Sequence, residues 1–182
     1  QPSVMIDLLD AWAKNRKTAR VLMVLDVSGS MGQPADGNDG DSKLDLAKEA
    51  AIDALDQFNP EDEVGLRVFT TNMGPGQDEE FQDLQPIAPI GANRERLAES
   101  IRNLIPQNAT PLYSVAQASY DEMFQSYDPT RINAVILLTD GANEDANPED
   151  DQQQQEKLLE NLRKGSSGEL SKPIRMFTVA YG

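Results

Sequence analysis

Two continuously apolar runs and a third, mainly apolar segment constrain the fold of this chain more than any other feature. They cover Val21–Leu25, Ala134–Leu138 and Ile174–Ala180. A strand of a parallel sheet is buried on both faces, so it reads as an unbroken apolar run rather than an alternating one. Segments with helical spacing separate the runs, and strands that alternate with helices indicate a parallel sheet. The sequence therefore predicts an α/β fold: a Rossmann-like, open, mainly parallel sheet with helices on both faces.

The other elements follow from caps, spacing and turn residues. Ser42–Asp45 has the form of a capping box, which predicts a helix that ends before Asn59–Pro60. Val64–Thr70 is expected to form a second strand, and Phe81–Leu84 a short, weak third strand that pairs as an edge hairpin partner. Further expected segments are an amphipathic lead-in helix over Val4–Asn15, a polar glycine-rich loop over Gly32–Asp41, helices over Arg94–Leu104, Pro111–Phe124 and about Gln152–Lys164, and a turn at Gly165–Gly168.

Composition narrows the classes of function. The 182 residues fit about one domain. Lys and Arg number 16 against 31 Asp and Glu, a net charge of −15, which is the opposite of what nucleic acid or an anionic membrane surface attracts. No apolar stretch approaches the roughly 20 residues of a membrane-spanning helix, so direct insertion is not expected. The chain has no Cys and no His, which excludes disulfides, His-based nucleophile activation and zinc sites built on these residues.

A carboxylate and two hydroxyls sit in the tight loop that leaves the first apolar run. They belong to the segment Asp26-Val27-Ser28-Gly29-Ser30. Mg²⁺ prefers near-octahedral oxygen coordination and retains several waters, so a site with one carboxylate and small neutral hydroxyls suits it. Such a site stays open to a further ligand.

Asp140 follows the second apolar run and therefore also lies at the carboxyl end of a predicted strand. In open α/β sheets, ligands bind outside the carboxyl ends of the strands, where the strand order reverses. If the strands before Asp26 and Asp140 are neighbours, their loops meet, and Thr110, at the start of the preceding helix, can join them. The candidate metal ligands are thus Asp26, Ser28, Ser30, Thr110 and Asp140.

The same residues carry a resemblance to a known family. Von Willebrand factor type A (vWA) domains have a metal-ion-dependent adhesion site built from a D-x-S-x-S loop, a separate Thr and a separate Asp. Here Asp26–Ser30, Thr110 and Asp140 occur in the same order, each in the matching strand or loop context. The amino-acid sequence of the first loop is most similar to that of bacterial members.

The resemblance implies a role for each residue. Ser28 and Ser30 would bind the metal directly, Thr110 directly or through water, and Asp26 and Asp140 largely through waters. Neutral hydroxyls leave the cation under-neutralised, so it stays electrophilic and accepts an Asp or Glu carboxylate of a protein partner. The implied function is a non-catalytic, metal-dependent protein-binding module of the adhesion type. Mg²⁺ is the expected ion, with Mn²⁺ and Ca²⁺ as alternatives.

Each candidate also has a purely structural interpretation. Thr110 before Pro111 has the form of a helix N-cap, where the helix dipole disfavours a cation. Ser28-Gly29-Ser30 fits a polar turn, and Asp140-Gly141 fits a turn at a strand end. Three independent turns would have to supply suitable oxygens in one place by coincidence, which favours the metal site.

Three other known motifs do not match the residues of this chain. Phosphatases of the haloacid dehalogenase type carry D-x-D-x-T, and Ser28 stands where the second, proton-transferring Asp is needed. A P-loop requires Gly-Lys-Ser/Thr, which the loop after Gly32 lacks. Asp36–Asp41 and Asn143–Gln154 are acidic like EF-hand loops but have Gly, Pro or Gln at key positions. Solvated acidic loops are the better interpretation of both.

Two features depart from the family pattern. Asn108-Ala109 replaces the Gly-Gly often found before the Thr, which bears on how that loop reaches the metal. The chain stops at Gly182, directly after a strand, whereas family members usually continue through further helices and a short edge strand. We therefore expect a lead-in junction over residues 1–19 and a domain over 20–182 that lacks the last edge strand and the C-terminal helix. This is expected of a fragment, or of a domain completed by other segments, because an uncovered edge strand invites pairing.

Three further expectations concern the partner surface, the alternative functions and the location of the protein. Acidic residues after Asp140 would favour a partner surface with Lys or Arg around one acidic anchor, so association should depend on salt. The alternative functions are an accessory subunit of an ATP-driven chelatase or remodelling complex and, less favoured, metal-assisted phosphoryl chemistry at Asp26. Residues 1–19 resemble the junction in large actinobacterial envelope proteins that also carry a solute-binding domain, which favours an extracytoplasmic setting.

Overall fold

The computed structural model describes residues 17–35, 40–141, 143–144, 149–166 and 172–181. The elements are, in chain order, β1 (Ala19–Asp26), η1 (Gly29–Gly32), α2 (Lys43–Leu55), β2 (Glu63–Met73), β3 (Glu79–Pro89), η2 (Ile90–Ala92), α3 (Arg94–Arg102), α4 (Leu112–Gln125), β4 (Ile132–Thr139), α5 (Asp151–Ser166) and β5 (Arg175–Ala180). The lead-in helix expected over Val4–Asn15 lies outside the described residues.

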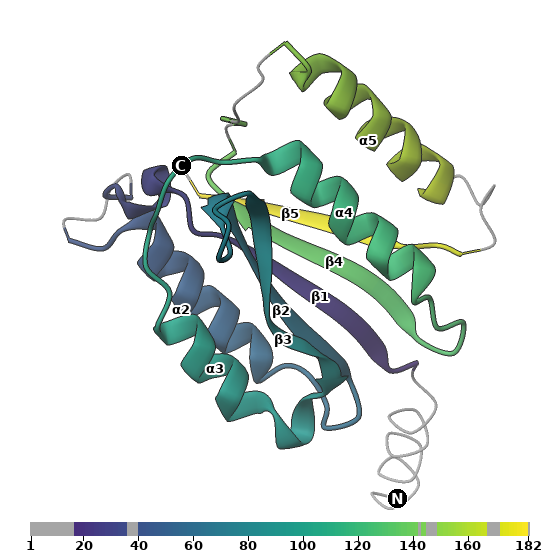
Figure 1. The fold of residues 1–182 in the computed structure, drawn as a ribbon. Helices are drawn as coiled ribbons and strands as arrows, with labels where there is room; N and C mark the ends of the chain where they lie inside the picture. Colours follow the sequence, from purple (N-terminus) through teal and green to yellow (C-terminus); the bar gives the residue numbers. More distant parts are fainter. Residues whose placement is uncertain (1–16, 36–39, 142, 145–148, 167–171, 182) are drawn as a thin grey trace, which may run out of the picture.

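The strands form one five-stranded sheet with the order β3-β2-β1-β4-β5. β1 pairs in parallel with β2 on one side and with β4 on the other, and β5 extends the sheet in parallel beyond β4. Among the described strands, only β3 runs antiparallel, beside β2. The chain leaves β1 toward β2 and later enters β4 on the opposite side, so the strand order reverses beside β1 (Figure 1). The predicted mainly parallel α/β sheet is confirmed.

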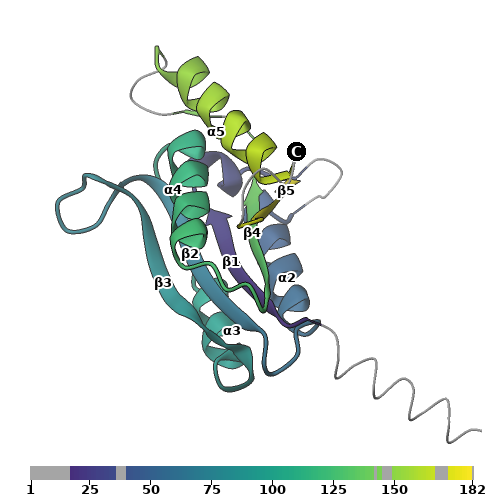
Figure 2. The ribbon, with the colours of Figure 1, turned by 90° about the vertical axis from the view of Figure 1, so that its right-hand side faces the viewer.

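Helices cover both faces of the sheet, with α2 and α3 on one face and α4 and α5 on the other (Figure 2). Side chains of β1 alternate between the two interfaces, as the pleat of a strand requires. Val21, Met23 and Leu25 face α2 and α3, whereas Leu22 and Val24 face α4. The apolar run is unbroken because both faces of β1 are buried. Among the described helices, none is both long and apolar enough to cross a membrane.

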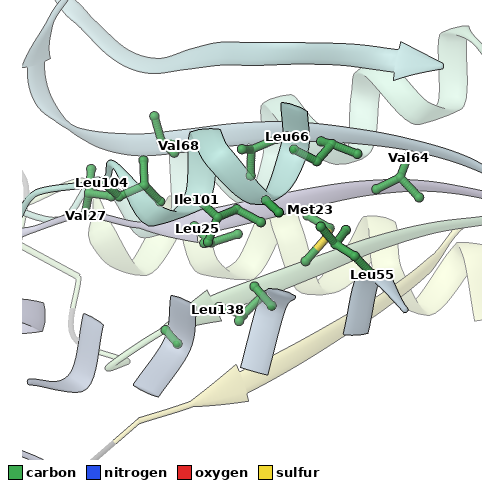
Figure 3. Close-up of a cluster of buried hydrophobic side chains, with 14 of the residues drawn as sticks. Met23, Leu25, Val27, Leu55, Val64, Leu66, Val68, Ile101, Leu104 and Leu138 are labelled. Carbon is green, nitrogen blue, oxygen red and sulfur yellow. The ribbon is translucent and has the colours of Figure 1, made fainter. Parts of the chain in front are cut away.

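Side chains of the helices on one face of the sheet pack against β1 close to its carboxyl end. Figure 3 shows Leu55 of α2 and Ile101 of α3 packed with Met23 and Leu25 of β1. Burying a side chain of this kind stabilises a fold by about 1.5–3 kcal/mol. Asp26 follows this packed segment as the last residue of β1, at the carboxyl edge of the sheet.

β5, which was expected to be a strand buried on both faces, lies at an edge of the described sheet, and most of its residues are exposed. Two element boundaries also differ from the expectation. β3 covers Glu79–Pro89 rather than the short segment Phe81–Leu84. None of its residues is buried, because it is an edge strand, and five of its eleven residues have charged or amide side chains, so it lacks the continuous apolar run of the central strands. Pro86 is tolerated at such an edge. α5 continues to Ser166, so the turn predicted at Gly165–Gly168 was placed too early, and its later residues lie outside the described ones.

Candidate metal centre

Asp26 is fully buried at the end of β1. Its Oδ1 accepts a hydrogen bond from the Ser28 backbone N–H at 2.8 Å, and its Oδ2 accepts one from Thr139 Oγ1 at 2.6 Å. Burial raises the pKa of Asp26 above its ordinary value, hydrogen bonds from Ser28 and Thr139 oppose the rise, and the nearby charge of Asp140 adds to it. A positive charge beside this fixed carboxylate would offset part of the cost of burying it.

Two serine hydroxyls and a second carboxylate form a continuous polar chain beyond the end of β1. Ser28 Oγ and Ser30 Oγ lie 3.0 Å apart, and Ser30 Oγ donates a hydrogen bond to Asp140 Oδ1 at 3.1 Å. The serines meet because the chain turns into the 3₁₀ helix η1 directly after Ser28. Four of the five predicted metal residues, including Asp26, are thus brought together.

Asp140 reaches this cluster from β4, the neighbour of β1 in the sheet. The next residue, Gly141, has a φ of 94°, which a glycine adopts without strain, and it turns the chain sharply away from the strand. Asp140 Oδ2 accepts a hydrogen bond from Lys43 Nζ at 3.1 Å. Lys43 is the first residue of α2, so an ammonium group from a helix also enters the cluster.

Thr110 lies buried in the loop between α3 and α4 and does not cap a helix. Its backbone N–H donates to Glu144 O at 2.9 Å, and its O accepts from Glu144 N–H at 2.8 Å. α4 begins at Leu112 with Pro111 as its N-cap residue, so the interpretation of Thr110 as the helix N-cap is wrong. The bridge to Glu144 instead joins the loop that carries Thr110 to the loop that follows Asp140.

Backbone contacts fasten the segment before Thr110 to the serine loop. Gln107 N–H donates to Val27 O at 2.6 Å, and Gly29 N–H donates to Asn108 O at 2.8 Å. These bonds bring Thr110 to the same edge of the sheet as the serines. The contacts that place Thr110 there are therefore those of its backbone and of its neighbours.

Asn108 explains how the loop works without the Gly-Gly pair expected from the family pattern. It has a φ of 38°, in the left-handed region that Asn enters more readily than most residues other than glycine. Its Nδ2 donates to Thr71 O at 2.8 Å, and the N–H of Ala109 donates to Thr71 Oγ1 at 3.2 Å. The side chain of Asn108 thus anchors the loop to the end of β2, which a glycine could not do.

Thr139 and Lys43 were not among the residues chosen from the sequence. Thr139 directly precedes Asp140, and a hydroxyl next to a predicted ligand at a strand end is a signal that could have identified it. Lys43 lies 97 positions from Asp140, within a capping box that explains its neighbours on helical grounds alone. Its role becomes visible only when α2 and β4 are placed in space.

The set of donors fits a hard divalent cation. Two hydroxyls and two carboxylates offer oxygen atoms, which Mg²⁺ and related ions prefer. Within the described parts of the chain, no group of three or more Asp, Glu, His or Cys side chains is placed to hold a metal ion by itself, so the hydroxyls are needed as donors. The cluster already accommodates one positive charge, the ammonium of Lys43. Ser28, Ser30, Asp26 and Asp140 could therefore hold a metal ion, with Thr110 beside them.

Solved structures share this fold at low sequence identity. The manganese-loaded TRAP protein of Plasmodium vivax aligns with a TM-score of 0.63 and 12% identity, over 91% of this chain and 58% of that one. The pilus adhesin SpaC of Lactobacillus rhamnosus GG aligns with a TM-score of 0.55 and 18% identity, over 71% and 15%. Proximal thread matrix protein 1 of the mussel byssus, with a zinc-occupied metal-ion-dependent adhesion site, aligns with a TM-score of 0.58 and 15% identity, over 90% and 38%. This chain spans less than two thirds of the length of each of these structures.

The family is established by sequence rather than by these structures. A search among curated proteins gives no match. The family model for the von Willebrand factor type A domain, however, matches residues 21–143, which is more than half of the chain and includes the serine loop, Thr110 and Asp140. The chain therefore belongs to the von Willebrand factor type A domain family.

Proposed function

We propose that this domain is a metal-dependent protein-binding module of the adhesion type. A divalent cation, Mg²⁺ with Mn²⁺ and Ca²⁺ as alternatives, would be held at the carboxyl edge of the sheet and would accept an Asp or Glu carboxylate of a partner protein. The observation that carries this proposal is the contact of Ser28 Oγ, Ser30 Oγ and Asp140 beside the buried Asp26. Membership of a family whose members generally bind protein ligands supports it.

Each residue of the site would contribute to metal binding according to its chemistry. Ser28 and Ser30 would hold the cation through neutral hydroxyls, Thr110 directly or through water, and Asp26 and Asp140 largely through waters. The bound cation would supply a Lewis-acidic position that the domain leaves open. Because hydroxyls donate no negative charge, the attraction for an incoming carboxylate is retained.

We propose no catalytic role for Asp26. A carboxylate nucleophile needs a free oxygen within reach of its substrate. Both oxygens of Asp26 accept hydrogen bonds, and the residue is fully buried behind Ser28 and Thr139. These contacts favour a supporting role in binding over phosphoryl transfer.

The charge of the surroundings would select the partner. Glu144 lies next to Thr110, and Asp151 begins α5 and accepts a hydrogen bond from Asn143 Nδ2 at 2.8 Å. An acidic rim of this kind favours a partner with Lys or Arg around its one acidic anchor, and such an association weakens as salt rises. Asp145, which belongs to the same acidic segment, lies outside the described residues.

The test is thermal unfolding of the chelator-treated domain during a titration with Mg²⁺, compared with the double variant Ser28→Ala/Ser30→Ala. Both proteins keep the net charge of −15, so diffuse attraction of cations to the acidic surface is the same in both. Wild type should gain about 2.7 kcal/mol at a hundredfold excess of metal over its dissociation constant, and the variant should lose that gain. An equal rise in both proteins, or none in wild type, would contradict the proposed site.

The second step, carboxylate binding, needs a separate readout. With Mn²⁺ in place of Mg²⁺, the relaxation rate of water protons reports the waters on the bound ion. Added acetate should lower that rate in wild type by replacing a water. A rate that stays constant up to high acetate concentrations would overturn the carboxylate part of the proposal and leave the metal site intact.

A further inference from the structure

Lys43 places a positive charge inside the proposed metal centre, where no recognised motif requires one. Its Nζ lies 3.1 Å from Asp140 Oδ2. The side chains of Lys43 and Asp140 are only 17% and 5% exposed, so the pair is largely shielded from water. The other oxygen of Asp140 accepts the hydrogen bond from Ser30, so both carboxylate oxygens are engaged inside the protein.

The position of Lys43 in its helix is electrostatically unfavourable without Asp140. Lys43 is the first residue of α2, and the N-terminal end of a helix carries a partial positive charge that repels a cation. The capping box of this helix uses Ser42 and Asp45, so it does not need Lys43. The contact with Asp140 offsets this repulsion and directs the ammonium toward the serine loop.

A metal ion and Lys43 would compete for the same carboxylate. With both carboxylates ionised, Asp26, Asp140 and Lys43 together carry one negative charge. A divalent cation turns this into one positive charge, and it must either displace the ammonium from Asp140 or bind against its repulsion. In either case the ammonium weakens metal binding. Without a metal, the same ammonium compensates Asp140 beside the buried Asp26.

We infer that Lys43 is an internal counter-ion that competes with the metal for Asp140, stabilises the metal-free centre and lowers its metal affinity. This inference rests on the proposed metal site and adds a residue that sets how tightly that site binds. A centre of this kind stays folded without metal and releases its ion readily. The local metal concentration would then control whether the module can bind a partner carboxylate.

The test uses Lys43→Met, which keeps a long unbranched side chain with good helix propensity and removes both the charge and the hydrogen bond to Asp140. In chelator-treated protein, this variant should lower the melting temperature by about 2–4 °C. In a calorimetric titration, its dissociation constant for Mg²⁺ should fall about tenfold, which corresponds to about 1.4 kcal/mol. Lys43→Arg keeps the charge and should restore both values toward those of wild type.

Lys48→Met is the matched control. Lys48 lies in the same helix, its side chain is also 17% exposed, and it pairs with Asp45, which is 57% exposed, at 3.8 Å. The control therefore changes the net charge by the same amount, outside the centre. Its effect on metal affinity and on metal-free stability should be small, because its partner Asp45 is exposed and 3.8 Å away, and such pairs contribute little.

The outcomes separate this inference from the proposed function. If wild type and Lys43→Met bind Mg²⁺ equally well, or if Lys48→Met gives the same gain as Lys43→Met, the competition is refuted and the metal site stands. If Lys43→Met binds more weakly than wild type, Lys43 supports the metal rather than competing with it, and the inference is wrong. If neither wild type nor Lys43→Met binds Mg²⁺, both proposals are overturned.

Discussion

At the scale of single residues, the centre is defined by how Asp26 is buried. The two groups that fix it, the Ser28 N–H and the Thr139 hydroxyl, are neutral donors. They orient the carboxylate without neutralising it, so burial raises its pKa. The metal-free protein therefore bears a cost for keeping Asp26 ionised, and a bound cation would offset that cost.

This cost predicts a pH dependence. The pKa of Asp26 in the folded protein lies above its ordinary value of 3.8 because of burial, so the folded state holds this proton more tightly than the unfolded state. The contribution of Asp26 to stability is thus most favourable below about pH 3.8 and is lost as the pH rises through the folded pKa. In the chelator-treated protein, Asp26→Asn should become steadily more stable relative to wild type across this window. Each pH unit between the two pKa values is worth about 1.4 kcal/mol.

Urea denaturation of both proteins at a series of pH values measures this difference. Comparing the two removes the opposite trend from other carboxylates, such as Asp45, whose pKa is lowered by the hydrogen bonds from Ser42. A difference that is constant with pH, or that shrinks as the pH rises, would show that burial of Asp26 carries no such cost. Asp26→Asn should also weaken the stabilisation by Mg²⁺.

The residues of the candidate metal site could be predicted from the sequence where they form a local pattern. Asp26, Ser28 and Ser30 stand together in one loop after an apolar run. Lys43 was missed because its partner, Asp140, lies 97 positions away, whereas Thr139 could have been chosen because it stands next to Asp140. Contacts over such distances in sequence are set by strand order and helix placement, and no local pattern encodes them.

At the scale of elements, the loop between α3 and α4 depends on one unusual backbone conformation. Asn108, with its φ of 38°, accepts a bond from Gly29 N–H and donates one to Thr71 O. Asn108→Val should lower the free energy of unfolding by about 1–2 kcal/mol, because a β-branched residue is strained in the left-handed region. It should also weaken metal binding, since the same loop carries Thr110.

Asn108→Gly is the comparison for this variant. Glycine adopts the same φ freely and loses only the side-chain bond to Thr71, so its cost should stay near that of one hydrogen bond, about 0.5–1.5 kcal/mol. Urea denaturation ranks the two variants. If valine is tolerated as well as glycine, the left-handed conformation is not what the loop requires.

Element prediction gave the buried central strands and correctly placed β3 as an edge hairpin strand, but it made β3 too short. The central strands are marked by apolar runs because both faces are covered. β3 also carries polar side chains with partners on the neighbouring strand: Arg67 of β2 donates to Asp83 Oδ1 at 2.7 Å and to Asp83 Oδ2 at 3.0 Å. Arg67 also lies 3.9 Å from the centre of the Phe81 ring. Phe81, Leu84 and Ile87 pack against the core but are only partly buried, and polar residues separate them, so the apolar pattern does not mark the full length of the strand.

At the scale of the whole molecule, the topology assembles the centre from distant segments. Parallel pairing of β1 with β4 aligns the carboxyl ends of these strands, and Asp26 and Asp140 therefore meet at one edge of the sheet (Figure 1). The sequence predicted this meeting only on the condition that the two strands are neighbours. The strand order fulfils that condition.

Because the net charge is −15, a test of the metal site must show where a bound ion lies. An acidic protein attracts divalent cations to many surface carboxylates, so binding alone does not identify a site. A specific centre and a diffuse ion atmosphere differ in where the ion rests and in which oxygens touch it.

The most direct measurement is an anomalous difference map from crystals of the domain soaked in Mn²⁺. The strongest peak should lie among the side chains of Ser28, Ser30 and Asp140. A strongest peak at the acidic start of α5, or no peak beside the serine hydroxyls at saturating Mn²⁺, would contradict the account.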